Sequence, residues 1–196
     1  MERIAETSPG LKARIAGILY LLIFIAAPSG AATATPAKMI ITLACDTSVA
    51  LILYDLLKPA GMRLSLLAAF FRLIFVAVMT VNSLNYFGLL DHFKNAHSAA
   101  AFNKGYGIAM VPFGIHCLLI GYLIFNSIFL PRILGILMAL AGLAYLIFLW
   151  PPLRRHLFFP YILIPGVVGE GSLTLWLLVM GVNVQRWKQQ DGAAVE

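Results

Sequence analysis

The amino-acid sequence predicts an all-α polytopic integral membrane protein, with six transmembrane helices packed in one bundle. Hydrophobic residues fill 61% of the 196 positions and charged residues only 11%, whereas a typical soluble domain has about 25% charged residues. Six apolar stretches of roughly 20 residues, the length at which a helix crosses a bilayer, occupy most of the chain. The short connections and tails that remain are too small for a catalytic domain outside the membrane.

The six expected spans form one transmembrane domain over residues 1–196, and prolines mark most of their boundaries. A proline lacks the backbone donor and therefore begins or ends a helix. At or next to the joints between spans lie Pro36, Pro59, Pro131 and Pro151. Pro112 and Pro165 lie inside spans and predict kinks. The expected spans are residues 15–34, 37–57, 62–90, 105–126, 130–150 and 160–185.

The first span has an alternative interpretation as a cleaved secretory signal. Lys12 and Arg14 precede an apolar run over residues 15–27, and the small residues 32–34 resemble a cleavage site. Cleavage would leave five spans and a new N-terminus near Thr35. We favour a retained helix, and mass spectrometry of the mature N-terminus distinguishes the two.

The distribution of lysines and arginines predicts that both termini are cytoplasmic, because cytoplasmic loops carry an excess of these residues. With the N-terminus inside, the cytoplasmic span ends carry Arg3, Lys12, Arg14, Lys58, Arg63, Arg132, Arg186 and Lys188. The opposite ends carry Lys38, Lys94, Lys104, Arg154 and Arg155. Aromatic rings that favour the membrane interface fall near the expected span ends at Tyr106, Trp150, Tyr161 and Trp187.

Four polar side chains lie near the middle of apolar spans: Asp46, Arg72, His116 and Glu170. Each is about ten residues from a span end, so at 1.5 Å per residue it lies ~14–15 Å deep in a hydrocarbon core of about 30 Å. A charge at that depth costs on the order of 2.5–3.5 kcal/mol, which makes such residues candidates for function. We therefore expect the four side chains to form one polar layer.

One arginine faces two carboxyl groups in this layer. Arg72 can hold one carboxylate through paired hydrogen bonds. The second carboxyl group must then pair with protonated His116 or carry a proton itself. Such a layer suits acid–base chemistry or polar recognition, with Asp46, Arg72, His116 and Glu170 as candidate catalytic residues. The competing interpretation is a buried ion-pair network that only fixes helix packing.

Other polar side chains are weaker candidates for contact with a substrate. Asn82, Ser83 and Tyr86 follow Arg72 on roughly the same helix face and would extend a polar path toward the outer surface. Ser172 lies two positions after Glu170 in the sequence, at the end of a glycine-rich run. The common alternative role of such residues is hydrogen bonding between helices.

No sequence motif indicates a metal site, a cofactor or nucleic acid. Cys45 and Cys117 lie inside apolar stretches and are expected to pack as free thiols. His92 and His97, in the longest connection, lack the spacing of a zinc site, so we expect a solvated segment there. The net charge of +6 is spread over helix ends, unlike the single patch that binds nucleic acid. The expected partners are membrane lipids and a small lipophilic molecule.

Six stretches, distributed over nearly the whole chain, together carry a resemblance to a known family. They are RIAGILYLL at residues 14–22, YDLLKP at 54–59, LAAFFRL at 67–73, HCLLIGY at 116–122, PRILGI at 131–136 and GEGSLTLWLLVMGVNVQRW at 169–187. Together they resemble a bacterial membrane-protein family known as domain of unknown function forty-three eighty-six. The resemblance implies a multi-span bacterial protein, for which we expect the cytoplasmic (inner) membrane, and it implies no established activity.

Three functions are compatible with the polar layer. The first is a membrane-embedded binding protein or enzyme that processes a small lipophilic molecule through a proton-driven step such as isomerisation or cyclisation. The second is a proton-linked transporter or channel subunit, for which kinks at Pro112 and Pro165 would fit. Six short spans without a clear inverted repeat would then need a homodimer. The third is a scaffold without catalytic activity.

Overall fold

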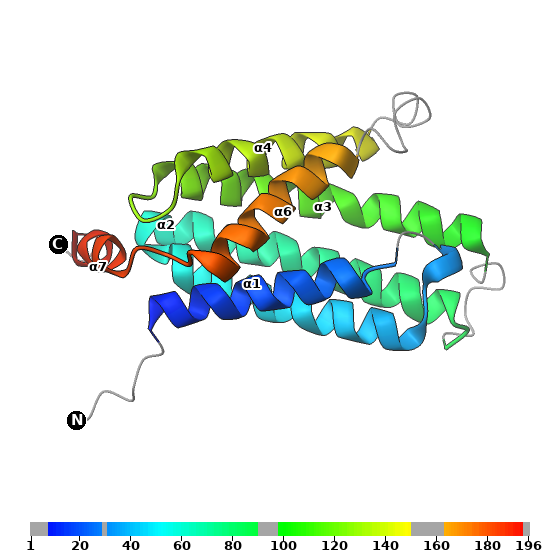
Figure 1. Ribbon diagram of the computed structural model, residues 1–196. Helices are drawn as coiled ribbons and strands as arrows, with labels where there is room; N and C mark the ends of the chain where they lie inside the picture. Colours follow the sequence, from blue (N-terminus) through cyan, green and yellow to red (C-terminus); the bar gives the residue numbers. More distant parts are fainter. Residues whose placement is uncertain (1–7, 29–30, 90–97, 150–162, 194–196) are drawn as a thin grey trace.

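The computed structural model describes residues 8–28, 31–89, 98–149 and 163–193, where every regular element is helical (Figure 1). The α-helices are α1 (Pro9–Ala26), α2 (Pro36–Tyr86), α3 (Ala99–Asn126), α4 (Arg132–Leu146), α6 (Leu163–Val179) and α7 (Val184–Ala193). Two short 3₁₀-helices, η1 (Ala31–Thr33) and η2 (Ile147–Leu149), follow α1 and α4. The prediction of an all-α helical membrane bundle is confirmed.

Helix α2 is a hairpin of two antiparallel arms. Its 51 residues would measure about 76 Å if straight, more than twice the ~30 Å thickness of a bilayer core. The backbone leaves helical geometry at Gly61 (φ 160°, ψ 93°). The chain then folds back, so that the Ser65 hydroxyl donates to the Tyr54 carbonyl oxygen at 2.8 Å. The two arms, residues 36–60 and 62–86, correspond to the second and third expected spans.

Four helices described by the structure are long and apolar enough to cross a membrane, namely α1, α2, α3 and the continuous stretch of α4 with η2. Helices α6 and α7, bent by 105° against each other, form a fifth candidate as a pair. Because α2 contributes two arms, all six apolar segments expected from the sequence occur as helical segments of one bundle. That each of them crosses the membrane once stays a prediction.

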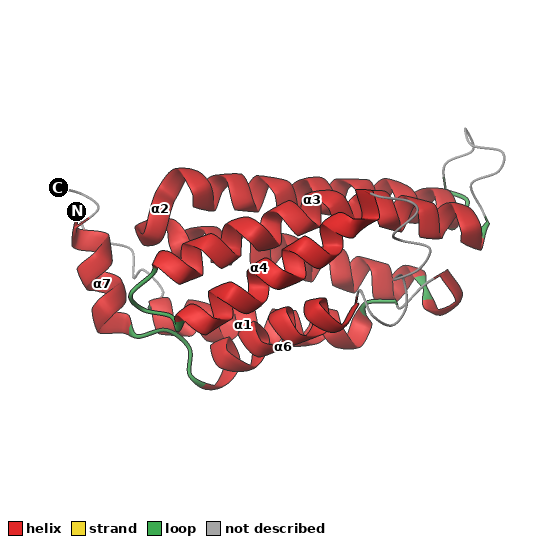
Figure 2. Cartoon of the chain, turned by 90° about the horizontal axis from the view of Figure 1, so that it is seen from above, coloured by secondary structure: helices red, strands yellow, loops and turns green. Residues whose placement is uncertain are grey.

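Successive segments run in alternate directions, and the start of α1 and helix α7 lie at the same end of the bundle (Figure 1, Figure 2). We call this end the terminal end and the opposite one the distal end. At the terminal end the carboxylate of Asp55 pairs with two lysines. Lys58 approaches one of its oxygens at 2.6 Å, and Lys12 pairs with the other. These pairs connect α1 to the turn of the α2 hairpin.

Close backbone contacts hold α3 against α4. A Cβ added to Gly121 would lie 2.7 Å from the carbonyl oxygen of Gly135. A Cβ added to Gly142 would lie 2.7 Å from the carbonyl oxygen of Gly114. In lipid the hydrophobic effect does not drive helices together, so small residues that let backbones touch stabilise the pair through van der Waals packing. Larger side chains at these positions would separate the two helices.

Helices α1 and α6 touch near the terminal end and diverge toward the distal end. A Cβ added to Gly17 would lie 2.7 Å from the backbone nitrogen of Leu178, so the two backbones are in contact there. Nearer the distal end, α6 packs against α4 instead, where a Cβ added to Gly169 would lie 2.6 Å from the Leu137 carbonyl oxygen. Figure 1 shows the resulting diagonal path of α6 from α1 to α4.

Gly181 ends α6 and begins the bend into α7. Its φ of 68° is left-handed, and its N–H donates to the Trp176 carbonyl oxygen at 2.9 Å, a common way for a helix to end. Helix α7 has no buried residue and lies at the terminal end. There the indole N–H of Trp187 donates to the Leu56 carbonyl oxygen at 2.8 Å, which ties α7 to the α2 hairpin.

Two helices begin earlier than expected because a serine caps each of them. Helix α1 begins at Pro9 rather than at residue 15, with Ser8 accepting from the Leu11 N–H at 3.3 Å. Helix α3 begins at Ala99 rather than at residue 105, with Ser98 accepting from the Ala101 N–H at 3.1 Å. A side-chain oxygen at this position satisfies a backbone donor that has no partner within the helix. Hydrophobicity alone did not reveal these polar first turns.

The predicted proline kinks do not break the helices that contain them. Helix α6 is described from Leu163 onward and is helical through Pro165, so the kink expected at Pro165 stays a prediction. Helix α3 stays continuous through Pro112. The last expected span also ends at Val179 rather than at residue 185. Some residues for which the sequence predicts a position or a role lie outside the described residues. They are Arg3, His92, Lys94, His97, Trp150, Pro151, Arg154, Arg155 and Tyr161.

Candidate functional site

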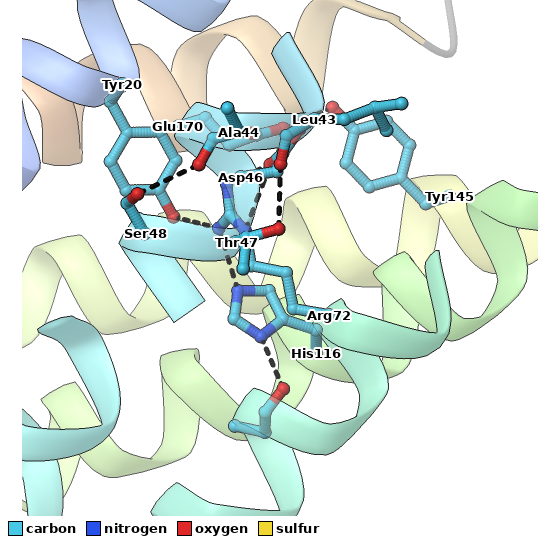
Figure 3. A network of polar contacts seen from close by, with 11 residues as sticks. Tyr20, Leu43, Ala44, Asp46, Thr47, Ser48, Arg72, His116, Tyr145 and Glu170 are labelled. Atoms are coloured by element: carbon cyan, nitrogen blue, oxygen red, sulfur yellow. Dashed lines mark hydrogen bonds and ion pairs between the residues drawn. The ribbon is translucent and has the colours of Figure 1, made fainter. Parts of the chain in front are cut away.

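Arg72 is the centre of a buried polar layer to which α1, both arms of α2 and α3 contribute (Figure 3). Its side chain is fully buried. Nε and Nη2 both donate to Oδ1 of Asp46, at 3.1 and 2.6 Å. Nη1 donates to the Tyr20 hydroxyl at 2.6 Å and to Nε2 of His116 at 3.1 Å. Every guanidinium nitrogen is therefore engaged within the layer.

His116 is a neutral imidazole in this arrangement. A guanidinium group can only donate hydrogen bonds, so Nε2 must accept the bond from Arg72. The ring proton then sits on Nδ1, which donates to the Ala68 carbonyl oxygen at 2.8 Å. Both ring nitrogens are occupied. This excludes a pair between protonated His116 and the second carboxyl group, one of the two arrangements that the sequence allowed.

Glu170 is that second carboxyl group, and it lies on α6 with only 8% of its surface exposed. Its Oε1 accepts a hydrogen bond from the Tyr145 hydroxyl of α4 at 2.5 Å. Within the described ranges, no lysine, arginine or histidine lies at ion-pair distance from it. Because Asp46 already matches the charge of Arg72, Glu170 is the surplus acid of the layer. A protonated Glu170 would make the layer electrically neutral.

A cavity of about 210 Å³ adjoins the layer. Asp46, Glu170 and Thr42 line it. The Thr42 hydroxyl is buried and has no hydrogen-bond partner among the described residues. Buried polar groups nearly always have a partner, so Thr42 brings a hydroxyl with unused hydrogen-bonding capacity next to the cavity. The rest of the wall consists of aliphatic side chains, three methionines and the rings of Phe24, Phe75, Tyr106, Phe113 and Tyr145.

The cavity lies on the distal side of the layer and opens between α1 and α6. In α1, which runs toward the distal end, the lining residue Phe24 follows Tyr20 in sequence. In α6, which runs back, the lining residue Val167 precedes Glu170. Phe24 is 39% exposed and Val167 is 56% exposed. The cavity wall therefore includes residues at the outer surface of the bundle, where these two helices diverge.

The layer has an enclosed half and an accessible half. Arg72 and His116 do not line the cavity, although both were candidate catalytic residues. Asp46 belongs to both halves, because its Oδ1 accepts both bonds from Arg72 while its Oδ2 takes no part in them. Glu170 and Thr42 belong to the accessible half. A molecule in the cavity would thus meet oxygen atoms and not the guanidinium.

The weaker candidates lie away from the cavity and bond to protein. The side chains of Asn82 and Tyr86 donate to carbonyl oxygens of α3 and η1, at 3.0 and 3.1 Å. The Ser83 hydroxyl donates to a carbonyl oxygen of its own helix at 2.6 Å. Ser172 does not line the cavity either. Asn82 and Tyr86 therefore form hydrogen bonds between elements and Ser83 bonds within its own helix, and none of these four side chains lines the cavity.

Three tyrosines of the site were not predicted from the sequence. Tyr20 and Tyr145 supply the hydroxyls that bond Arg72 and Glu170. Tyr106 was expected at the membrane interface, but the earlier start of α3 carries it into the helix, where it lines the cavity. A tyrosine within an apolar helix could have predicted such a role, because a buried phenol hydroxyl usually needs a hydrogen-bond partner.

Cys45 and Cys117 are buried and free, as expected. Among the described residues, no three histidine, cysteine or carboxylate side chains are arranged to hold a metal ion.

The fold and the site define a class of protein: a polytopic helical membrane protein whose bundle encloses an arginine–aspartate pair beside a cavity with a second carboxyl group. The chain belongs to the family described as Domain of unknown function (DUF4386), whose model matches residues 33–181. A relative from Archaeoglobus fulgidus, described as "Uncharacterized protein", is 31% identical over 139 residues, which cover 69% of this chain and 76% of the relative. No solved structure matches the chain. The family resemblance is confirmed, and it brings no activity with it.

Proposed function

We propose that the protein is a membrane-embedded binding protein for a small lipophilic molecule, whose polar group is received by Glu170, Thr42 and Asp46. The observation that carries the proposal is a largely apolar cavity whose wall includes two carboxylate residues, Asp46 and Glu170, with Thr42 beside them. The Thr42 hydroxyl has no hydrogen-bond partner among the described residues. A mostly apolar pocket with a few converging polar groups is the usual form of a small-molecule site. The cavity of about 210 Å³ is smaller than the roughly 300–1,000 Å³ of drug-sized sites, so the bound part is compact.

The same geometry equips Glu170 for acid–base chemistry on the bound molecule. A carboxyl group that is not needed to balance Arg72 can hold a proton and transfer it to a ligand within hydrogen-bond reach. Arg72 and His116, which are enclosed, hold the helices around the site. Processing of the ligand by proton transfer is therefore assigned to Glu170, with Asp46 and Thr42 orienting the ligand.

For the orientation, we propose the bacterial cytoplasmic (inner) membrane with both termini cytoplasmic. Over the whole sequence, the expected span ends on the terminal side carry eight lysines and arginines, and those on the opposite side carry five. The eight are Arg3, Lys12, Arg14, Lys58, Arg63, Arg132, Arg186 and Lys188, and the five are Lys38, Lys94, Lys104, Arg154 and Arg155. This excess matches the positive-inside rule. The cavity would then open toward the outer leaflet. A cysteine introduced at Glu196 should react with a membrane-impermeant maleimide only after the cells are permeabilised.

Photolabelling tests the proposed binding site. A lipid-soluble alkyl diazirine, activated in proteoliposomes, should label peptides that carry the cavity wall. Ala27→Trp should reduce that labelling at least about fivefold, because Ala27 lines the cavity at its mouth. The matched control is Ile25→Trp on the same helix, since Ile25 is 71% exposed and is not a cavity residue. Equal labelling in both variants would refute a binding cavity and leave the scaffold hypothesis.

The transporter hypothesis has less support than binding. It relied on helices broken near the midplane at Pro112 and Pro165, and α3 is continuous through Pro112. No described feature supplies the second access route, from the terminal end, that alternating access needs. Proteoliposomes that show no proton uptake during ligand addition would agree with the binding proposal.

A further inference from the structure

We infer that the ligand is a lipophilic amine, which is held in the cavity as an ammonium ion by the carboxylates of Glu170 and Asp46. This inference rests on the proposed function and specifies its ligand class. It follows from three properties of the cavity wall: the sign of its charges, the direction of its hydrogen bonds and the nature of its apolar part.

The charged groups that line the cavity are carboxyl groups. Asp46 and Glu170 both lie in its wall, whereas Arg72 lies behind Asp46 and does not reach it. An anionic ligand would therefore meet only charges of its own sign, at a depth where water does not screen them. A cationic ligand would supply the positive charge that the layer lacks when Glu170 is ionised.

Most groups of the cavity wall that remain free to form a hydrogen bond are acceptors. Oδ2 of Asp46 is not used by Arg72, and among the described residues Oε1 of Glu170 accepts a bond from Tyr145 alone. The Thr42 hydroxyl has no partner within the described structure and can accept as well. An ammonium group has several donors and no acceptor. It therefore satisfies oxygens that an ether, ester or ketone would leave unmatched.

The apolar part of the wall fits an organic cation rather than a metal ion. Five aromatic rings border the cavity, those of Phe24, Phe75, Tyr106, Phe113 and Tyr145. Ring faces attract ammonium groups and pack well against hydrocarbon. Sodium- or calcium-like ions need a shell of several oxygens instead. The aliphatic and methionine side chains that complete the wall suit the hydrocarbon body of an amine.

Binding exchanges a proton between two bases. The amine crosses lipid in its neutral form, and its nitrogen lone pair takes the proton of the Glu170 carboxyl group. An N–H bond forms as the O–H bond breaks, which leaves an ammonium ion beside a carboxylate. Because a free alkylamine in water is mostly protonated near neutral pH, like a lysine side chain, each binding event releases about one proton to the aqueous phase.

This proton exchange gives the affinity a defined pH dependence. With one proton released, affinity rises about tenfold per pH unit while free Glu170 is protonated and the free amine is charged. The other titratable or charged groups that face Glu170 or its partners come from every helix packed around it. They are Tyr20 of α1, Asp46 and Arg72 of α2, Tyr106, His116 and Cys117 of α3, and Tyr145 of α4.

Isothermal titration calorimetry of the full-length protein in nanodiscs tests the inference. The probes are 2-phenylethylamine and its neutral isostere 2-phenylethanol, each in two buffers with different ionisation enthalpies. We expect the amine to bind at least about tenfold more tightly than the alcohol and to release about one proton. Glu170→Gln should weaken amine binding at least about tenfold and abolish the proton release. Asp55→Asn, the same charge change outside the cavity, should leave both unchanged.

Each result decides something. If the alcohol binds as tightly as the amine, the cation inference is overturned and the proposed function stands. If neither probe binds, the inference is also overturned, and photolabelling judges the proposed function separately. Unchanged amine affinity in Glu170→Gln overturns it as well. Should that variant unfold, Thr42→Val replaces it, because loss of the hydroxyl acceptor should weaken amine binding severalfold.

Discussion

Replacing Asp46 with asparagine should destabilise the bundle far more than replacing Glu170 with glutamine. Asparagine keeps an oxygen that can accept from Arg72, but it removes the negative charge. Arg72 would remain as a fully buried cation whose other contacts are the neutral Tyr20 and His116. Removing one partner of a buried ion pair costs about 3–5 kcal/mol. Glu170→Gln leaves no such orphan, since glutamine still accepts from Tyr145, and should cost less than about 1.5 kcal/mol.

Thermal unfolding in detergent measures this difference, and the chain carries its own reporter. Cys45 and Cys117 are free and buried, so a thiol-reactive fluorogenic dye responds only when the bundle opens. For a chain of this size each kcal/mol shifts the Tm by about 2–4 °C. Asp46→Asn should therefore lower the Tm by about 6–20 °C, and Glu170→Gln by less than about 6 °C.

The double variant completes the test, because Glu170 is the other carboxyl group of the layer. If Glu170 partly compensates the charge of Arg72 when Asp46 is gone, the double variant should lose more stability than the two single variants lose together. The reasoning would be refuted if Asp46→Asn unfolds within about 2 °C of the unaltered protein. It would equally fail if Glu170→Gln were the more damaging change.

Three further changes test how the helices are held. Gly17→Leu should lower stability by about 1–3 kcal/mol in the same assay, because its side chain would overlap the backbone at Leu178; an unchanged Tm would contradict the contact between α1 and α6. Trp187→Phe should cost about 0.5–1.5 kcal/mol and speed proteolysis of α7 through loss of the indole bond; unchanged proteolysis would count against that tie. Asp55→Asn should cost less than about 1 kcal/mol and lose its effect in high salt, since its lysine pairs are partly exposed; a loss as large as that for Asp46 would contradict this ranking.

Hydrophobicity was enough to predict the helices and the polar layer. A run of apolar residues interrupted once by Asp46 or Arg72 identifies both a span and the depth of its charged residue. Depth then brings residues from different spans to one level, which is how Asp46 and Arg72 come to face each other across the α2 hairpin. Equal depth does not determine which neighbours touch.

The assignment of partners within the layer depends on helix rotation and crossing, and the sequence did not reveal these. His116 bonds to Arg72 and the Ala68 carbonyl oxygen rather than to a carboxylate. Glu170 bonds to Tyr145 because α6 crosses toward α4 at its distal end. The cavity arises from the same crossing, since α1 and α6 touch at Gly17 and separate beyond it. Interhelical angles of this kind follow from packing that local sequence patterns do not encode.

The interaction of α1 with the layer also bears on the signal-peptide alternative. The Tyr20 hydroxyl oxygen accepts a hydrogen bond from Arg72, and the guanidinium carbon lies 4.7 Å from the centre of the Tyr20 ring. Cleavage near Thr35 would expose the ion pair on that side. A retained first helix is therefore the expectation, and Tyr20→Phe should lower the Tm by a few degrees.

Carbodiimide labelling distinguishes the two carboxyl groups of the site, because Glu170 is expected to bear an accessible proton while Arg72 keeps Asp46 ionised. Lipid-soluble diisopropylcarbodiimide adds to protonated carboxyl groups, and peptide mass spectrometry locates the adduct. In proteoliposomes at neutral pH we expect an adduct on Glu170 and not on Asp46, formed more slowly when 2-phenylethylamine is present. Labelling of Asp46 at an equal rate, or an unreactive Glu170 in folded protein, would contradict the account.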